Sequence, residues 1–264
     1  MYVSKVFSFS PDYDLAINAD RVVYGGGGYA IDLEDGREVF RKERDRDLPY
    51  EIEHTYPDYS LYPELTKDTA YGFLTRGCPR GCSFCIVEKK EGRCSRKVAD
   101  LTEFWSGQKN IVLCDPNILA AREWRDLLLQ LIESKAWVDI NQGLDIRLMT
   151  EEKAQMLSRI KMKEVHFAWD RYQDKDTILA KLEMFAKVRR QGQHNSQVYV
   201  LTNYDTTFEQ DLERIYTLRD MGYWPYVTIY DKAHSEKKYR DLMRWVNMRA
   251  TFQVVKRFED YGRN

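Results

Sequence analysis

The chain has 264 residues, of which 43% are hydrophobic, so it can form one large α/β domain, with or without a short appendage. Its 41 Lys and Arg residues against 42 Asp and Glu leave a net charge of −1, which removes any global electrostatic argument for nucleic-acid or anionic-membrane binding. No apolar run approaches the roughly 18 residues of a membrane span and the start lacks a signal-peptide pattern, so the sequence predicts a cytoplasmic protein.

Residues 1–69 differ in pattern from the rest of the chain. Two short strands are predicted in VSKVFSFS and RVVYGGGGYA. The next stretch, DLEDGREVFRKERDRDLPYEIEH, is highly charged and is interpreted as an irregular connection. Aromatic residues and prolines in YPDYSLYPEL indicate a linker that packs on the main domain. The sequence therefore predicts a short β-containing segment and a linker before the main domain.

From residue 70 onward, a β-rich run, a polar loop and an amphipathic helical stretch follow one another repeatedly. The runs AYGFLT, NIVLC, WVDIN, EVHFAWD, QVYVLTN and WPYVTIYD begin at Ala70, Asn110, Trp137, Glu164, Gln197 and Trp224. Parallel strands need such crossovers, so the repeat predicts a parallel α/β fold. Six units favour a barrel or part-barrel over residues 70–250, followed by a short tail over 251–264.

The intervening helices have recognisable ends. Residues 123–133 carry apolar side chains at helical spacing. Thr150 is placed as the N-cap of the next helix, and the helix over 207–221 is expected to end at Gly222. A last helix is predicted over 235–249.

Three of the five cysteines, Cys78, Cys82 and Cys85, are crowded into CPRGCSFC, directly after the first predicted strand. In a βα barrel, the loops at the carboxyl ends of the strands carry the chemistry. The odd cysteine count argues against a disulfide framework in a reducing compartment. A structural zinc site with Cys94 as fourth ligand, burial of the thiols as small hydrophobes, and a [4Fe–4S] cluster with one open iron are the alternatives. The neighbouring Gly, Pro and Arg residues disfavour burial, and the three-thiol spacing favours the cluster.

CPRGCSFC resembles the CxxxCxΦC signature of the radical S-adenosylmethionine (SAM) superfamily, with Phe84 as the aromatic residue. The resemblance implies a partial (β/α)6 barrel and a [4Fe–4S] cluster held by Cys78, Cys82 and Cys85. It further implies SAM bound to the open iron, with Phe84 beside the adenine. The expected reaction is reductive cleavage of SAM to a 5′-deoxyadenosyl radical, which abstracts hydrogen from a substrate that the sequence does not identify.

The segment AYGFLTRGCPRGCSFC is similar to the corresponding segment in the branch of that superfamily with an N-terminal B12-binding domain. The Asp-x-His-x-x-Gly motif of such domains is absent from residues 1–69, where His54 is the one histidine. The resemblance therefore implies only a truncated or degenerate Rossmann-like remnant in this region. Cobalamin is not expected as a cofactor.

Polar residues after the second and third predicted strands are candidate SAM contacts. Asp115 and Asn117 stand where superfamily members carry the Gly-Gly-Glu segment that contacts the methionyl amino group, although DPN replaces it here. The other interpretation of Asp115 is an N-cap of the following helix. Gln142, Asp145 and Arg147 follow the third strand. Arg147 is interpreted either as a clamp for a carboxylate or phosphate or as the structural partner of Asp145.

The last three strands end in further candidates. Asp170 ends the fourth strand, where the resemblance implies a ribose contact, and Asn203 ends the fifth. Tyr230, on the sixth, is expected to offer backbone groups to adenine. His166, inside its strand, is expected to line the barrel or the core rather than to bind a ligand. Cys114 is expected in the core and Cys94 in an exposed loop.

Basic residues are concentrated around the cysteine motif, at Arg76, Arg80, Lys89, Lys90, Arg93, Arg96 and Lys97. They are interpreted either as a solvated loop or as a docking surface for an acidic electron donor such as a flavodoxin or ferredoxin, or for an anionic substrate. No membrane partner is expected, and a nucleic-acid substrate stays open. The alternative function is a non-catalytic protein with a structural zinc or iron–sulfur site.

Overall fold

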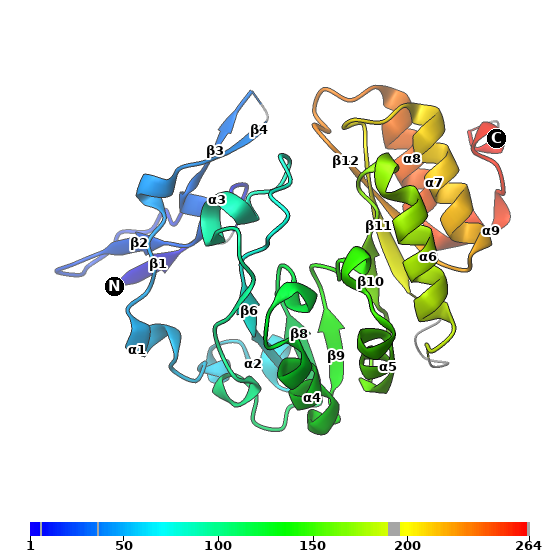
Figure 1. The fold of residues 1–264 in the computed structure, drawn as a ribbon. Helices are drawn as coiled ribbons and strands as arrows, with labels where there is room; N and C mark the ends of the chain where they lie inside the picture. Colours follow the sequence, from blue (N-terminus) through cyan, green and yellow to red (C-terminus); the bar gives the residue numbers. More distant parts are fainter. Residues whose placement is uncertain (6, 36, 190–195, 263–264) are drawn as a thin grey trace. The chain divides into compact units, whose positions relative to one another are not determined.

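The computed structural model describes residues 1–5, 7–35, 37–189 and 196–262 (Figure 1). The chain forms two compact units. The small unit consists of Met1–Thr55 and Gly77–Arg93, and the large unit of Tyr56–Arg76 and Cys94–Asn264. The cysteine motif thus belongs to the small unit, whereas the βα repeat belongs to the large one.

The small unit is built from paired short strands and short helices. β1 (Tyr2–Ser4) and β2 (Val23–Gly25) pair in parallel, which confirms the two strands predicted there. β3 (Ile31–Glu34) and β4 (Arg37–Phe40) form an antiparallel hairpin, so the prediction of an irregular connection was wrong in this part. Asp35 has a left-handed φ of 50°, and Asp-Gly is a strong hairpin signal. The described residues of this unit also form the α-helices α1 (Tyr50–Glu53) and α3 (Val87–Glu91) and the 3₁₀ helices Gly27–Tyr29 and Lys42–Arg44.

The large unit contains parallel strands in chain order. One sheet has the order β5 (Thr69–Gly72), β8 (Asn110–Leu113) and β9 (Trp137–Ile140). Another has the order β10 (His166–Ala168), β11 (Gln197–Thr202) and β12 (Trp224–Ile229). A parallel bridge between Leu144 and Phe167 joins the segment after β9 to β10. Each predicted β-rich run therefore contains a strand, and the described residues form a mixed α/β fold without a closed barrel.

Helices occupy the connections between these strands (Figure 1). They are α4 (Trp124–Ser134), α5 (Glu151–Arg159), α6 (Lys175–Ala186) and α7 (Phe208–Asp220), with α2 (Pro63–Thr66) before the first strand and α8 (Lys237–Asn247) and α9 (Arg249–Val254) after the last. The Thr150 hydroxyl accepts from the backbone N–H of Lys153 at 3.2 Å, which confirms this N-cap. No helix within the described ranges has the length and apolar character needed to cross a bilayer.

Alternate strand residues form the core with the helices. Ile111 and Leu113 of β8 are fully buried in a cluster that also contains Leu127 and Leu131 of α4. A second cluster surrounds Trp245, Phe252 and Val227, from α8, α9 and β12. Because successive strand residues point to opposite faces, the residues between the buried ones face away from these helices.

A short antiparallel ribbon brackets the cysteine segment in the chain. β6 (Thr75–Arg76) pairs with β7 (Arg96–Lys97), with Thr75 opposite Lys97. The backbone N–H of Val98 donates to the Leu74 oxygen at 2.8 Å and extends this ribbon. Residues 77–95, which contain the motif, run between the two short strands.

A close contact between Gly72 and Phe104 gives a test of the packing around β5. A Cβ at Gly72 would lie 2.5 Å from the buried Phe104 ring, which is less than real Cβ contacts allow. We expect Gly72→Ala to lower the free energy of unfolding by about 1–3 kcal/mol through overpacking. In the double variant with Phe104→Leu, the smaller side chain gives way, so the loss should be less than the sum of the two single losses. Urea unfolding of the four proteins measures this coupling, and strictly additive losses would contradict the packing.

Candidate functional site

The cysteine segment has a backbone fixed by hydrogen bonds within the small unit. The N–H of Gly77 donates to Glu91 Oε2 at 2.9 Å, and that of Cys78 donates to the Gly92 oxygen at 3.2 Å. The N–H of Cys85 donates to the Cys82 oxygen at 2.9 Å, which closes a turn. Gly81 has a left-handed φ of 58°, and a Cβ there would lie 2.6 Å from Arg93 Nη2. The positive φ favours glycine at this position, whereas the exposed Arg93 side chain is able to move away from a Cβ.

The three cysteines of this segment are thiols, each partly exposed to solvent. This exposure disfavours their interpretation as buried hydrophobes. Three thiols are the donor set that an iron–sulfur cluster takes, so the residue chemistry fits such a group. Among the described residues, however, no three His, Cys, Asp or Glu side chains are grouped so as to hold a metal ion. The thiols are thus present in the right number but are not preassembled as a metal site.

The remaining two cysteines differ in their surroundings. Cys94 is exposed, as predicted. Cys114, directly after β8, is half-buried rather than fully in the core. Burial raises the pKa of the Cys114 thiol, and the neighbouring Asp115 charge raises it further.

Asp115 is fully buried and binds the loop after β5. Its Oδ2 accepts from the N–H of Leu74 at 3.1 Å, and its Oδ1 accepts from the N–H and the hydroxyl of Thr75, both at 2.6 Å. Burial raises the pKa of Asp115 to about 6, although these hydrogen bonds act in the opposite direction. The carboxylate therefore joins two strand ends. Asn117, also a candidate, is buried as well, and its backbone oxygen accepts from the Ser95 hydroxyl at 2.8 Å.

The candidates after β9 separate into an exposed amide and an ion-pair cluster. Gln142 is exposed. Asp145 accepts from Nε of Arg147 at 2.7 Å, and Nη1 of Arg147 donates to Asp174 at 2.7 Å. Burial alone would lower the pKa of Arg147, but the two carboxylates outweigh it and raise the pKa. The structural pairing of Arg147 with Asp145 is thus the observed arrangement.

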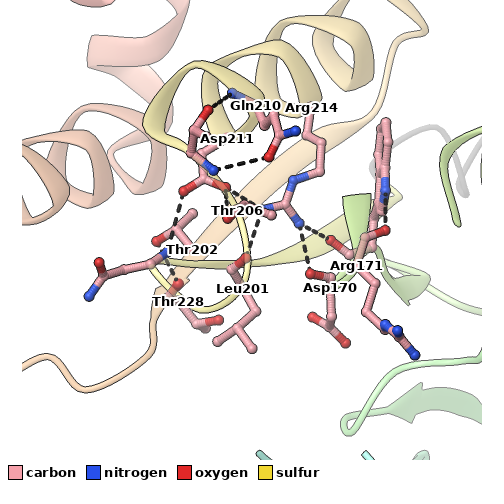
Figure 2. A network of polar contacts seen from close by, with 12 residues as sticks. Asp170, Arg171, Leu201, Thr202, Thr206, Gln210, Asp211, Arg214 and Thr228 are labelled. Carbon is pink, nitrogen blue, oxygen red and sulfur yellow. Dashed lines mark hydrogen bonds and ion pairs between the residues drawn. The ribbon is translucent and has the colours of Figure 1, made fainter. Parts of the chain in front are cut away.

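A fully buried arginine on α7 holds two neighbouring strand ends (Figure 2). Nη1 of Arg214 donates to the backbone oxygens of Trp169 at 2.6 Å and Asp170 at 3.1 Å, and Nη2 donates to that of Leu201 at 2.8 Å. The side chain of Asp170 lies near Arg214 and Arg147. Burial raises the pKa of Asp170 to about 6, whereas these two positive charges lower it. Asp170 is therefore a half-buried residue whose carboxyl group has a raised pKa.

Asp211, which pairs with Arg214, extends the same network to the ends of β11 and β12 (Figure 2). It accepts from the Thr206 hydroxyl at 2.6 Å and from the N–H of Asn203 at 3.3 Å. Asn203 has a left-handed φ of 60°, and its Nδ2 donates to the Tyr230 oxygen at 3.2 Å. Two predicted site residues, Asn203 and Tyr230, are thus in direct contact.

The candidate residues of the large unit lie in three separate groups. Asp145, Arg147 and Asp170 interact electrostatically, Asn203 meets Tyr230, and Asp115 is committed to residues 74 and 75. Phe84 is partly buried in the small unit. Sequence reasoning missed Asp211 and Arg214. Both lie on the buried face of α7, each four residues before an apolar residue of that face, Ile215 and Leu218. A charged pair within such an apolar stripe is the signal that would have identified them.

Comparison of the chain with protein-family models and with curated proteins finds no match. The chemistry of the thiol segment and of the strand ends is therefore what bears on function.

Removal of the Arg214 side-chain charge tests the network around α7. Arg214→Met leaves Asp211 buried without its counter-ion, so we expect the free energy of unfolding to fall by about 3–5 kcal/mol. Arg125, exposed and ion-paired with Glu152, provides the matched control. Arg125→Met should cost less than about 1 kcal/mol. Equal losses in chemical denaturation would show that the buried pair does not hold the strand ends.

The raised pKa of Asp170 predicts a pH dependence of stability. Its pKa rises from the ordinary 3.8 to about 6, so the folded state binds the proton more tightly than the unfolded chain does. This contribution is complete at acidic pH and is lost as the pH rises through about 6. The free energy of unfolding of the wild type relative to Asp170→Asn should therefore fall by roughly 1–4 kcal/mol as the pH rises from 3.8 to about 6. Denaturation at several pH values measures it, with exposed Asp176→Asn as the control that should show no such slope.

Proposed function

We propose that the protein is a radical SAM enzyme that acts in the reducing cytoplasm on a substrate still to be identified. The observation that carries this proposal is the Cys78-x3-Cys82-x2-Cys85 segment, with three partly exposed thiols and the aromatic Phe84. It follows β5, the first strand of a sequential parallel α/β repeat. The cysteine segment thus comes first in the chain, before the loops that follow β8, β9, β10, β11 and β12. The signature and its position together favour this function over a metal site that only braces a loop.

The order of the strands supports a partial (β/α)6 barrel as the finer description of the large unit. The strands pair in chain order, all in parallel, with the Leu144–Phe167 bridge between the two sheets. Such an order has no reversal point, unlike a doubly wound sheet, in which the strand order reverses. Sequential βα units favour a curved array whose carboxyl-terminal loops share one end.

The three thiols are the residues that would hold the cluster. When bound, a [4Fe–4S] cluster with SAM on its open iron supplies an electron to the sulfonium and thereby a 5′-deoxyadenosyl radical. Cys78, Cys82 and Cys85 would each bind as a thiolate, and the hydrogen bonds from Gly77 and Cys78 to residues 91 and 92 keep their backbone in place. Assembly of the sulfurs would accompany binding, as is general for metal sites in short loops.

The strand-end residues have different proposed roles. Asp170 is the proposed ribose contact, and Asn203 and Tyr230 would offer polar groups to the adenosyl part. Gln142, which is exposed, is the candidate after β9 with an accessible amide. The engagement of Asp115 with Thr75 and of Arg147 with Asp145 and Asp174 favours a positioning role for these side chains. Phe84 would pack beside the adenine, and cobalamin has no part in the proposal.

An acidic flavodoxin-like or ferredoxin-like donor is the proposed source of the electron. The basic residues between positions 76 and 97 would attract it, although Arg93 is paired with Glu88 and Lys97 with Asp100. Exposed charges act mainly on the association rate and are screened by salt. Reduction should therefore slow as the ionic strength rises.

The decisive experiment measures iron, acid-labile sulfide and 5′-deoxyadenosine on anaerobically prepared protein with SAM and reductant. Replacing Cys78, Cys82 or Cys85 by Ala should abolish both the cluster and 5′-deoxyadenosine formation, since each thiolate is assigned to one iron. Cys94→Ala and Cys114→Ala are the matched controls and should retain cleavage. Phe84→Ala should keep the cluster and weaken SAM binding.

Two outcomes contradict the proposal. Loss of the metal in Cys94→Ala, as complete as in the other three variants, would indicate a four-thiolate site without an open iron. A stoichiometric metal or cluster without any SAM cleavage would identify a non-catalytic protein with a structural zinc or iron–sulfur site.

A further inference from the structure

A row of side chains crosses the sheet face that points away from the helices of the large unit. Tyr71, Val112 and Asp139 stand in register on β5, β8 and β9, each beside buried helix-facing residues. His166 stacks on Tyr199 with ring centroids 5.4 Å apart and planes at 16°, and Tyr199 meets Tyr226 at 5.8 Å. This face is thus lined by aromatic and polar groups.

A pocket of about 400 Å³ opens on this face. This volume falls in the range of small-molecule sites, roughly 300–1,000 Å³. Thr69, Asn110 and Trp137, which line the pocket, are each the first residue of a strand. The pocket therefore lies toward the amino ends of these strands, whereas the candidate SAM contacts of the large unit follow the carboxyl ends.

His166 and Asp139 are neighbours in the pocket wall, whose other polar residues are Thr69, Asn110, Lys163 and Glu164. Nε2 of His166 lies 3.3 Å from Oδ1 of Asp139, and the two side chains are 11% and 49% exposed. Within the described residues, neither this Oδ1 nor Nδ1 of His166 has a hydrogen-bond partner, and both atoms are buried. Of the two positions expected for His166, the core and the inner lining of the strand array, the structure shows the lining. Since Oδ1 is buried, the exposed oxygen of Asp139 is Oδ2, an acceptor on the pocket side.

Aromatic surface is left uncovered beside this acceptor. Trp137 and Tyr71 line the pocket and are 43% and 42% exposed. Nζ of Lys163 lies 5.9 Å from the centre of the Trp137 ring. Broad exposed rings next to a hydrogen-bonding edge are the combination with which proteins bind unstacked nucleobases.

We propose that this pocket binds a nucleobase with adjacent N–H donors, as guanine has, stacked on Trp137 and read by the Asp139 carboxylate. The exposed Oδ2 has two lone pairs and can accept from two neighbouring N–H groups, and guanine offers its ring N1–H beside its exocyclic amine. The buried Oδ1 lies 3.3 Å from Nε2 of His166, so Oδ2 is the oxygen available to a base. This binding needs neither the cluster nor SAM, so it goes beyond the proposed function and stands or falls separately from it.

Titration of the full chain with guanosine, without SAM or reductant, tests this inference by calorimetry or ligand-observed NMR. Guanosine should bind roughly tenfold or more tightly than inosine, which lacks the exocyclic amine. Asp139→Asn should remove this preference, whereas Asp126→Asn, at an exposed position of α4, should keep it. Trp137→Leu should lower the affinities for guanosine and for inosine by the same factor, because stacking on the ring does not depend on the groups at the base edge.

A trinucleotide RNA with a central guanosine distinguishes the sources of the base. Tighter binding of the RNA than of the nucleoside assigns the pocket to a base in a strand, and equal or weaker binding assigns it to a free nucleoside. If Asp139→Asn fails to fold, the ratio of guanosine to inosine affinity in the wild type still decides. Absence of guanosine binding, or equal affinities for guanosine and inosine, overturns the inference.

Discussion

The buried ion pair between Arg214 and Asp211 is the constraint on which the carboxyl-terminal edge of the second sheet depends. A buried guanidinium without partners costs on the order of several kcal/mol, so Arg214 must stay within reach of Asp211 and of the carbonyls near the ends of β10 and β11. One side chain thereby sets the spacing of two strands and a helix. Asp170 and Asn203 take their positions from this network, and Tyr230 takes its position from Asn203.

A second buried carboxylate has the same role in the first sheet. Asp115 binds the loop after β5 through two backbone N–H groups, as Asp211 binds Asn203. The polar residues at the strand ends are therefore of two kinds, those that tie loops together and those left to meet a ligand. Residue type does not separate the two kinds, because a carboxylate that suits an ammonium group suits a pair of N–H groups equally well.

Local patterns were sufficient to predict the strands and helices of the repeat. The Thr150 cap and the helix that ends before Gly222 depend on neighbours a few residues away, and these features were confirmed. The hairpin around Asp35 was not predicted because the many charged residues of this stretch suggested an irregular segment, although its Asp-Gly pair is typical of a hairpin. The partner of Asp115 could not be predicted, since Thr75 is distant in sequence and only the fold brings them together. The pairing of Arg147 with Asp145 could be foreseen as an alternative, because these two residues share one turn.

The β6–β7 ribbon also affects the entropy of the segment that it encloses. Pairing of Thr75 with Lys97 brings the two ends of residues 77–95 within one strand spacing. Closing a flexible loop costs entropy that grows slowly with its length, and here the backbone pairing meets that cost before any ligand arrives. The three thiols are then confined to a small volume, which gives each a high effective concentration with respect to the other two. For the proposed cluster, the contacts that follow binding by a first thiolate would therefore be intramolecular events within a loop that is already closed.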